Sequence, residues 1–214
     1  MTPFRLGVLV SGTGTNLQAI LDTLHGREEV EVACVVASRA GAGGLARAES
    51  AGVEAAVFAA AEYAERSSRD DALADFLEAR EIDLLVLAGF MELLSADFVR
   101  RFEGRIINVH PSLLPAFPGV RAIEQALEYG VRVTGVTVHL VDEGIDTGPI
   151  LLQEAIELPY AADIADVEQR IHAVEHRLLP DAIRMIARGA LREGDAGAGE
   201  RRRIGIEEGR HDER

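Results

Sequence analysis

Residues 4–24 read Phe-Arg-Leu-Gly-Val-Leu-Val-Ser-Gly-Thr-Gly-Thr-Asn-Leu-Gln-Ala-Ile-Leu-Asp-Thr-Leu. The apolar run over residues 4–10 predicts a buried strand, and the amphipathic stretch over residues 16–24 predicts a helix. Gly12 and Gly14 lie between them, where a tight strand-to-helix turn is typical. This strand, loop and helix form the unit that the chain goes on to repeat, so the stretch decides the fold class.

The same alternation continues through the first half of the chain. Strands are predicted over residues 30–37, 53–58, 83–88 and 105–109, and helices over residues 44–51, 70–79 and 96–102. These strands are continuous apolar runs, which indicates burial on both faces, as in a parallel sheet covered by helices.

The pattern changes after Pro118. A helix is predicted over residues 122–129 with Gly130 as its stop signal, followed by strands over residues 133–141 and 149–158. The first of these strands alternates polar and apolar residues, which favours less complete burial. A long helix over residues 163–188 contains Pro180, where we expect a kink or a break.

The predicted fold class is therefore α/β, with a single domain and a mostly parallel twisted sheet carrying helices on both faces. Antiparallel strands are added to the sheet in the C-terminal half. We expect residues 1–192 to form the domain and residues 193–214 to be a disordered charged tail, because Asp, Gly, Ala, Glu and Arg dominate there.

Composition excludes several classes of function. The chain has 214 residues with 48% hydrophobic content, enough for one domain with a large core. Its net charge of −14 argues against a nucleic-acid surface, and all 22 basic residues are Arg, which removes lysine-based chemistry. The single cysteine, Cys34, excludes disulfides. We find no leader or membrane-spanning stretch, so a soluble cytoplasmic protein without a membrane partner is expected.

Residues 107–119 read Ile-Asn-Val-His-Pro-Ser-Leu-Leu-Pro-Ala-Phe-Pro-Gly, and residues 142–148 read Asp-Glu-Gly-Ile-Asp-Thr-Gly. Asn108 and His110 are two apart, so on a strand both leave the same face at its carboxyl end. Together with Asp146 they suit acyl transfer through an oxyanion. As a hypothesis, His110 and Asn108 donate to the oxygen of a formyl carbon under attack by an amine, while Asp146 orients the imidazole and helps remove the proton. The chain is therefore predicted to be an enzyme.

Plainer interpretations of the same residues stay open. His110 is also compatible with a hydrogen-bonded loop histidine, and Asp146 with an Asx turn. His139 is interpreted as structural, because no acid pairs with it in the sequence. His172 and His176 have a spacing that can bind metal, but a third ligand is missing, so we predict no metal site.

The glycine-rich loop places Gly14, Thr15 and Asn16 at a helix N-terminus, where a phosphate is favoured. Leu17 replaces the third glycine of the dinucleotide fingerprint and the Walker lysine is absent, so a monophosphate fits better than a dinucleotide. The alternative is a plain tight turn with Asn16 as the helix cap.

Four separated segments share their order with one family: Val-Ser-Gly-Thr-Gly-Thr-Asn-Leu-Gln-Ala-Ile (residues 10–20), Leu-Ala-Gly-Phe-Met (87–91), Asn-Val-His-Pro-Ser-Leu-Leu-Pro (108–115) and Asp-Glu-Gly-Ile-Asp-Thr-Gly-Pro-Ile (142–150). From about residue 4 to residue 190 the chain resembles the phosphoribosylglycinamide formyltransferases, the folate-dependent GAR transformylases of purine biosynthesis. The resemblance implies a Rossmann-like formyltransferase domain over residues 1–192. It also implies formyl transfer from 10-formyltetrahydrofolate to phosphoribosylglycinamide, with small molecules as the only partners and a monomer or homodimer.

The resemblance also implies roles for individual residues. The catalytic residues would be Asn108, His110 and Asp146, and the ribotide would be held by Gly14, Thr15, Asn16 and Glu175. The folate would lie against Arg69, Met91, Glu92, Leu93, Leu94, Asn108 and Asp142. The cationic Arg69 suits the glutamate carboxylate of a folate. Glu92 departs from the family, because many members carry Arg there, so a side-chain salt link to the cosubstrate is lost or reversed.

Three other functions compete. Methionyl-tRNA formyltransferases share the catalytic loop but have an Arg-Gly-containing segment after Leu-Leu-Pro and a further RNA-binding domain, whereas Phe117-Pro118-Gly119 follows here. Formyltetrahydrofolate deformylases carry an added N-terminal domain, for which the early strand at residue 4 leaves no room in this sequence. A non-catalytic sensor has little use for an oxyanion donor set and is disfavoured.

Overall fold

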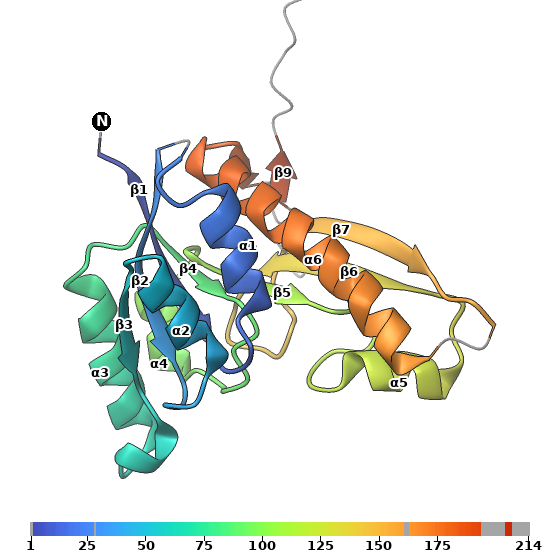
Figure 1. Cartoon of the computed structure of the whole chain (residues 1–214), viewed down its shortest axis with the longest axis horizontal. Helices are drawn as coiled ribbons and strands as arrows, with labels where there is room; N and C mark the ends of the chain where they lie inside the picture. Colours follow the sequence, from blue (N-terminus) through green and yellow to red (C-terminus); the bar gives the residue numbers. More distant parts are fainter. Residues whose placement is uncertain (1, 28, 161–162, 194–203, 207–214) are drawn as a thin grey trace, which may run out of the picture.

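The computed structural model describes residues 2–27, 29–160, 163–193 and 204–206, and its core is one seven-stranded sheet (Figure 1). The strands lie in the order β3-β2-β1-β4-β5-β6-β7. The pairs from β3 to β5 are parallel, and β6 and β7 are added antiparallel. The predicted fold class is thus confirmed. The strands are β1 (Phe4–Val10), β2 (Val30–Ala37), β3 (Glu54–Val57), β4 (Leu84–Leu87), β5 (Ile106–His110), β6 (Val133–Leu140) and β7 (Ile150–Glu157).

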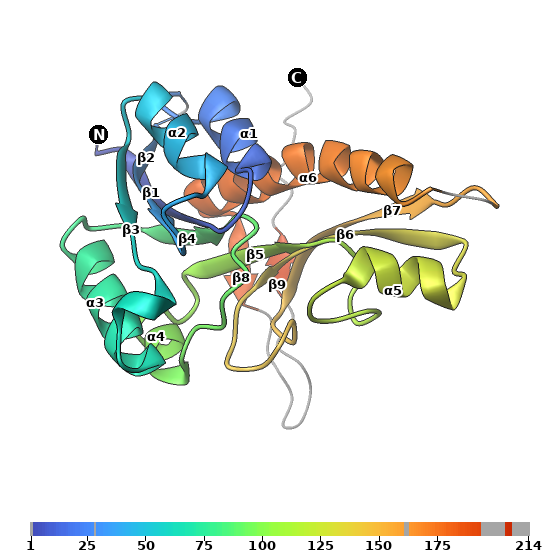
Figure 2. The same cartoon turned by 60° about the horizontal axis from the view of Figure 1, so that its bottom comes forward.

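Helices cover both faces of this sheet, as Figure 2 shows, with α1, α2 and α6 on one side and α3 and α4 on the other. Along β1, Leu6, Val8 and Val10 join the hydrophobic cluster under α1 and α6, whereas Leu9 joins the cluster under α3 and α4. Burial on both faces is the reason that the strand reads as a continuous apolar run. The helices are α1 (Thr15–Thr23), α2 (Gly43–Ser50), α3 (Arg66–Glu78), α4 (Ala96–Arg101), α5 (Ala122–Tyr129) and α6 (Ile164–Ala187), with a short 3-10 turn at Ala60–Glu62.

Helix α6 runs without interruption through Pro180, so the helix does not break there. A proline in a helix interior removes one hydrogen bond and costs about 3 kcal/mol. Leu178, Leu179, Ala182 and Ile183 are all buried on either side of it. Their packing holds both halves of the helix against the core and outweighs the proline.

Two further expectations about elements need correction. Helix α3 begins at Arg66 rather than at residue 70, because its first turn is polar and no apolar spacing marks it. Strand β6 is buried over most of its length, although its alternation indicated partial burial. Its polar residues Thr137 and His139 are buried because they have hydrogen-bond partners inside the fold. Every other predicted boundary lies within one residue of the structure.

The end of the chain contributes a second, two-stranded antiparallel sheet from β8 (Leu191–Glu193) and β9 (Ile204–Ile206). The rest of the predicted tail, residues 194–203 and 207–214, lies outside the described residues. Among the described helices, every one is too short or too polar to pass through a bilayer.

Candidate active site

The loops that follow β1 and β4 meet at the carboxyl edge of the parallel strands. Ser11, directly after β1, donates its amide to the Gly89 carbonyl at 3.1 Å, and its hydroxyl accepts from the Met91 amide at 2.9 Å. These two bonds join the glycine-rich loop to the segment that was predicted to read the folate. The motifs that were far apart in the sequence are therefore neighbours in space.

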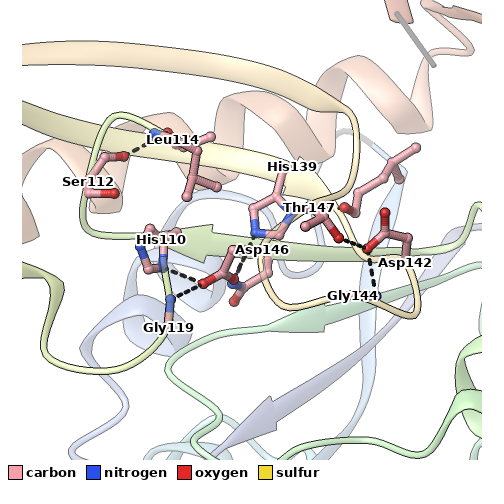
Figure 3. A network of polar contacts seen from close by, with 12 residues as sticks. His110, Ser112, Leu114, Gly119, His139, Asp142, Gly144, Asp146 and Thr147 are labelled. Carbon is pink, nitrogen blue, oxygen red and sulfur yellow. Dashed lines mark hydrogen bonds and ion pairs between the residues drawn. The ribbon is translucent and has the colours of Figure 1, made fainter. Parts of the chain in front are cut away.

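Asn108 and His110 lie two apart on β5 and so leave the same side of the strand. The loop between β6 and β7 brings Asp146 against His110 (Figure 3). The Asp146 carboxylate lies 3.4 Å from His110 Nδ1 through Oδ2. The three residues predicted to be catalytic are thus brought together. Gly148 allows the loop to close, because a Cβ at that position would overlap the carbonyl oxygen of Leu140.

His139 belongs to the same group, contrary to the interpretation that no acid pairs with it. It lies opposite Asn108 in the β5/β6 register, and its Nε2 is 3.2 Å from Asn108 Nδ2 and 3.5 Å from Asp146 Oδ1. The sequence carried a signal in the alternation of β6, but only the strand register places His139 beside Asn108. We call Asn108, His110, His139 and Asp146 the Asp146 cluster.

Backbone carbonyls determine which nitrogens of the two imidazoles carry hydrogen. His110 Nε2 lies 2.8 Å from the Phe117 carbonyl, and His139 Nδ1 lies 2.8 Å from the Leu140 carbonyl. A carbonyl can only accept, so these two nitrogens donate. In the neutral rings, the remaining nitrogens therefore both present lone pairs toward the Asp146 carboxylate.

The electrostatics of the cluster favour a neutral imidazole beside an ionised carboxylate. Burial lowers the pKa of His110, as does the nearby His139, and this outweighs Asp146 and the Phe117 carbonyl, which raise it. Burial alone would raise the pKa of Asp146. The imidazolium form of His139, which can donate to Asp146, holds that pKa below its usual value together with the Gly119 amide and nearby His110. The Gly119 amide donates to Asp146 Oδ2 at 2.7 Å.

The Asp146 carboxylate contacts the Gly119 amide and the two histidines, and Asp142 makes an Asx turn in this loop. Asp142 Oδ1 accepts from the Gly144 amide at 3.0 Å and from the Thr147 hydroxyl at 2.6 Å. Asp146 has a φ of +53°, a strained value for a residue other than glycine. The loop thus uses one aspartate for its shape and leaves the other for the two histidines.

Residues that the sequence analysis missed support the segment after His110. The Thr137 hydroxyl donates to the Ser112 carbonyl at 2.7 Å and accepts from the Leu114 amide at 3.1 Å. Gln153 of β7 donates to the Leu114 carbonyl at 2.9 Å. The antiparallel strands therefore hold the segment whose Phe117 carbonyl meets His110.

Asn16 and Glu175, both predicted to contact the ribotide, form a buried pair between α1 and α6. Asn16 Nδ2 donates to Glu175 Oε2 at 3.0 Å, and burial raises the pKa of Glu175. Asn16 Oδ1 is buried and has no partner among the described residues. Asn16 does not cap the helix; the cap position is Gly14, whose φ is +74° and which makes no side-chain bond. The first amides of α1, starting at Thr15, are left without a side-chain cap.

Gly14 is also needed for close packing of the loop. A Cβ there would lie 2.7 Å from Gly44 Cα, so the loop and the start of α2 approach backbone to backbone. Arg47 of α2 then donates to the Thr13 carbonyl at 2.8 Å. The loop that was predicted to hold a phosphate is thus rigidly positioned.

Of the residues predicted to bind the folate, some are exposed and others are buried in the protein. Met91 and Leu93 are exposed, at 71% and 59%, whereas Leu94 packs against the cluster under α4. Arg69 is only 1% exposed, so it does not present an open cation. Its guanidinium contacts Asp70 Oδ1 and Glu92 Oε2, each at 2.7 Å, and the Leu93 carbonyl at 3.2 Å. We call Arg69, Asp70, Glu92 and the Leu93 backbone the Arg69 cluster.

His172 and the half-buried His176 stack along α6 with ring centroids 6.1 Å apart. Within the part of the chain that the structure describes, no group of three or more His, Cys, Asp or Glu side chains could hold a metal ion. A hollow of about 830 Å³ lies at the other edge of the sheet, at the amino end of β1, and shares no residue with the groups above.

Comparisons with known proteins agree with this geometry. The chain is 43% identical over 194 residues to the trifunctional purine biosynthetic protein adenosine-3 of Gallus gallus. The aligned region covers 90% of this chain but only 19% of that protein. The chain thus spans about a fifth of the length of such relatives. It is 40% identical over 189 residues to the phosphoribosylglycinamide formyltransferase of Haemophilus influenzae, covering 88% of this chain and 89% of the relative.

A solved structure, glycinamide ribonucleotide transformylase 1 from Symbiobacterium toebii, superposes with a TM-score of 0.89 at 48% identity, covering 96% of this chain and 94% of that one. Residues 4–183 match the formyl transferase family. That match contains the glycine-rich loop, the whole Asp146 cluster and Glu175. On this match, and with its strands and loops arranged as described, the chain belongs to the formyl transferase family.

Proposed function

We propose that this chain transfers the formyl group of 10-formyltetrahydrofolate to the amine of 5'-phosphoribosylglycinamide. The products would be formylglycinamide ribonucleotide and tetrahydrofolate, in de novo purine biosynthesis. The name and nearly full-length match of the Haemophilus influenzae relative support this choice of substrates. The observation that carries the chemistry is the Asp146 cluster, in which one carboxylate faces two imidazoles beside an amide donor.

The flanking groups suit the two substrates. Exposed Met91, Leu93 and Ile145 lie on the two loops beside the cluster, where they would contact the aromatic rings of a folate. On the other side, the uncapped start of α1 suits a phosphate. The unpaired Asn16 oxygen and the Glu175 carboxylate offer acceptors for the glycinamide end.

In the proposed mechanism the amine attacks the formyl carbon and forms a tetrahedral intermediate with an oxyanion. Asn108 has a second amide hydrogen besides the one near His139, and it would donate this to the oxyanion. His110 Nε2 would supply the other donor after the formyl oxygen replaces the Phe117 carbonyl. Phe117 has a φ of +52°, a strained conformation, which favours such an exchange.

The proton released by the amine needs an acceptor close to the reacting atoms. His110 Nδ1 and His139 Nε2 face the two oxygens of Asp146 at 3.4 and 3.5 Å. With a neutral imidazole and an ionised carboxylate, this cluster has room for one proton, held between Asp146 and either ring. The leaving tetrahydrofolate nitrogen would then take a proton as the intermediate collapses.

The test is an absorbance assay for tetrahydrofolate formation from 10-formyltetrahydrofolate, run with and without phosphoribosylglycinamide. We expect turnover only when the ribotide is present. Equal turnover without it would indicate hydrolysis of the formylfolate, and no turnover in either case would exclude the proposed enzyme. A His139→Ala variant separates catalysis from substrate binding, since it should slow the reaction without weakening ribotide binding.

A further inference from the structure

The guanidinium of Arg69 is buried, and each of its three nitrogens donates at least one hydrogen bond inside the protein. Its Nε and Nη2 donate to Asp70 Oδ1 at 2.9 and 2.7 Å, and its Nη1 donates to Glu92 Oε2 at 2.7 Å. Nη2 also reaches the Leu93 carbonyl at 3.2 Å. Four of the five N–H groups of the guanidinium thus have a partner, and because Arg69 is only 1% exposed it is poorly accessible to a cosubstrate carboxylate.

The charges in this cluster do not cancel. Arg69 contributes one positive charge, whereas Asp70 and Glu92 contribute two negative ones. Asp70 is completely buried, but the Glu92 side chain is 35% exposed. The excess negative charge thus faces solvent at Glu92, between the exposed side chains of Met91 and Leu93.

The neighbouring arginine is outnumbered in the same way. Arg100 of α4 pairs with Asp97 and, at 2.9 Å, with Glu143 on the loop that carries Asp146. The Arg100–Glu143 pair joins the loop after β6 to α4, which directly follows the loop after β4. Across both loops, each arginine is paired with two carboxylates, and the local charge is negative.

Resting on the proposed function, we propose that Glu92 is a specificity-determining residue that removes any preference for polyglutamylated folates. Each glutamate added to a folate tail brings one more carboxylate. With the folate rings against Met91 and Leu93, the glutamate tail leaves the site past the exposed carboxylate of Glu92. The guanidinium of Arg69 is buried and does not meet the tail. Coulomb repulsion then offsets the contacts that a longer tail gains, so monoglutamyl and triglutamyl folates bind with similar affinity.

Glu92→Gln tests this with little change in shape, because the amide oxygen of Gln can still accept from Arg69. Isothermal titration calorimetry with tetrahydrofolate carrying one or three glutamates gives the affinity ratio without turnover. We expect the variant to bind the triglutamate about three- to tenfold more tightly relative to the monoglutamate than the wild type does. The gain should shrink as salt is raised, because exposed charges are screened.

Glu31→Gln is the matched control. Glu31 pairs with Arg5 at 2.9 Å and is similarly exposed, at 39%, but it lies on β2 facing the amino end of β1, away from the site. Its removal changes the net charge equally and should leave the ratio unchanged. Glu143→Gln provides a second variant, for which we expect a smaller shift in the same direction, since its pair with Arg100 is more exposed.

Other outcomes would overturn the inference. If Glu92→Gln strengthens or weakens both folates equally, Glu92 only shapes the loop. If wild-type protein already prefers the triglutamate strongly, the tail is bound by cations elsewhere. Failure of the wild type to bind either folate would remove the proposed function as well, whereas normal folate binding with an unaltered ratio would remove only the role of Glu92.

Discussion

The Asp146 cluster and the Arg69 cluster are two groups of buried charge at the same edge of the sheet, and they differ in how completely their polar atoms are paired. Arg69 holds its two carboxylates at 2.7 Å, within ordinary hydrogen-bond distance. Asp146 faces its two imidazoles at 3.4 and 3.5 Å, with lone pairs on the facing nitrogens of the neutral rings. The closed cluster is built to fasten a loop, whereas the open one has capacity left for a proton.

The largest effect is expected at His110, in the open Asp146 cluster. We expect His110→Ala to reduce kcat by about 10³-fold, equivalent to about 4 kcal/mol of barrier, because an oxyanion donor and a proton acceptor are both lost. Ribotide binding should survive. Steady-state rates and calorimetry check this, with His25→Ala as control, since His25 accepts only a backbone amide far from the site. Near-normal turnover would remove His110 from the mechanism.

The opposite result is expected for the closed cluster. Arg69→Met leaves Asp70 buried without its partner, which should lower the free energy of unfolding by about 3 kcal/mol. For a domain of this size Tm would fall by about 6–12 °C, while kcat per folded molecule changes little. Arg100→Met, which removes two exposed ion pairs, should lower Tm much less than Arg69→Met does. A large loss of kcat with unchanged Tm in Arg69→Met would reverse the assignment of roles.

Glu175 sharpens the comparison, because it is another buried group that is not fully paired. Burial raises its pKa above the value of the unfolded chain, so the stability linked to this group is present at low pH and is lost as pH rises through the folded pKa. Glu175→Gln should therefore be more stable than wild type at pH 8, by about 1 kcal/mol, with little difference at pH 4. Its KM for the ribotide should rise. Thermal melts at both pH values test the stability prediction, and ribotide kinetics test the rise in KM. A variant less stable than wild type at pH 8 would contradict the stability prediction.

The smallest effect concerns acid stability. Burial lowers the pKa of His110, so below its usual value of 6.5 the unfolded chain takes up this proton more readily than the folded one. Stability should fall as pH drops from 7 toward 5. Denaturant unfolding should show a shallower fall in His110→Ala, by less than about 1 kcal/mol over that range. Equal slopes in both proteins would show that His110 does not contribute.

Local pattern predicted most of the fold and the first part of the site. The period of the apolar residues gave the strands and helices, and the spacing of Asn108 and His110 put both on one face of β5. His139 escaped prediction because its partners follow from the β5/β6 register, which pairs residues 31 apart. No single run of sequence contains that information.

Arg69 shows the same difficulty for charged residues. It lies in a polar first turn of α3 that carries no apolar spacing, and its partner Glu92 is 23 residues away. A cation beside a predicted ligand site suggested recognition of an anion. Only its burial among Asp70, Glu92 and the Leu93 carbonyl shows that the charge is already occupied.

The Phe117 carbonyl on His110 Nε2 gives the proposed site a built-in competitor. A neutral formyl oxygen that displaces it exchanges one carbonyl acceptor for another and gains little affinity. An oxyanion makes a charge-assisted bond that a carbonyl cannot match. The loop would thus cancel much of the ground-state binding while leaving transition-state binding intact, which is the difference that raises kcat. Tetrahedral, anionic mimics of the intermediate should for this reason bind far more tightly than amide analogues of the formyl group.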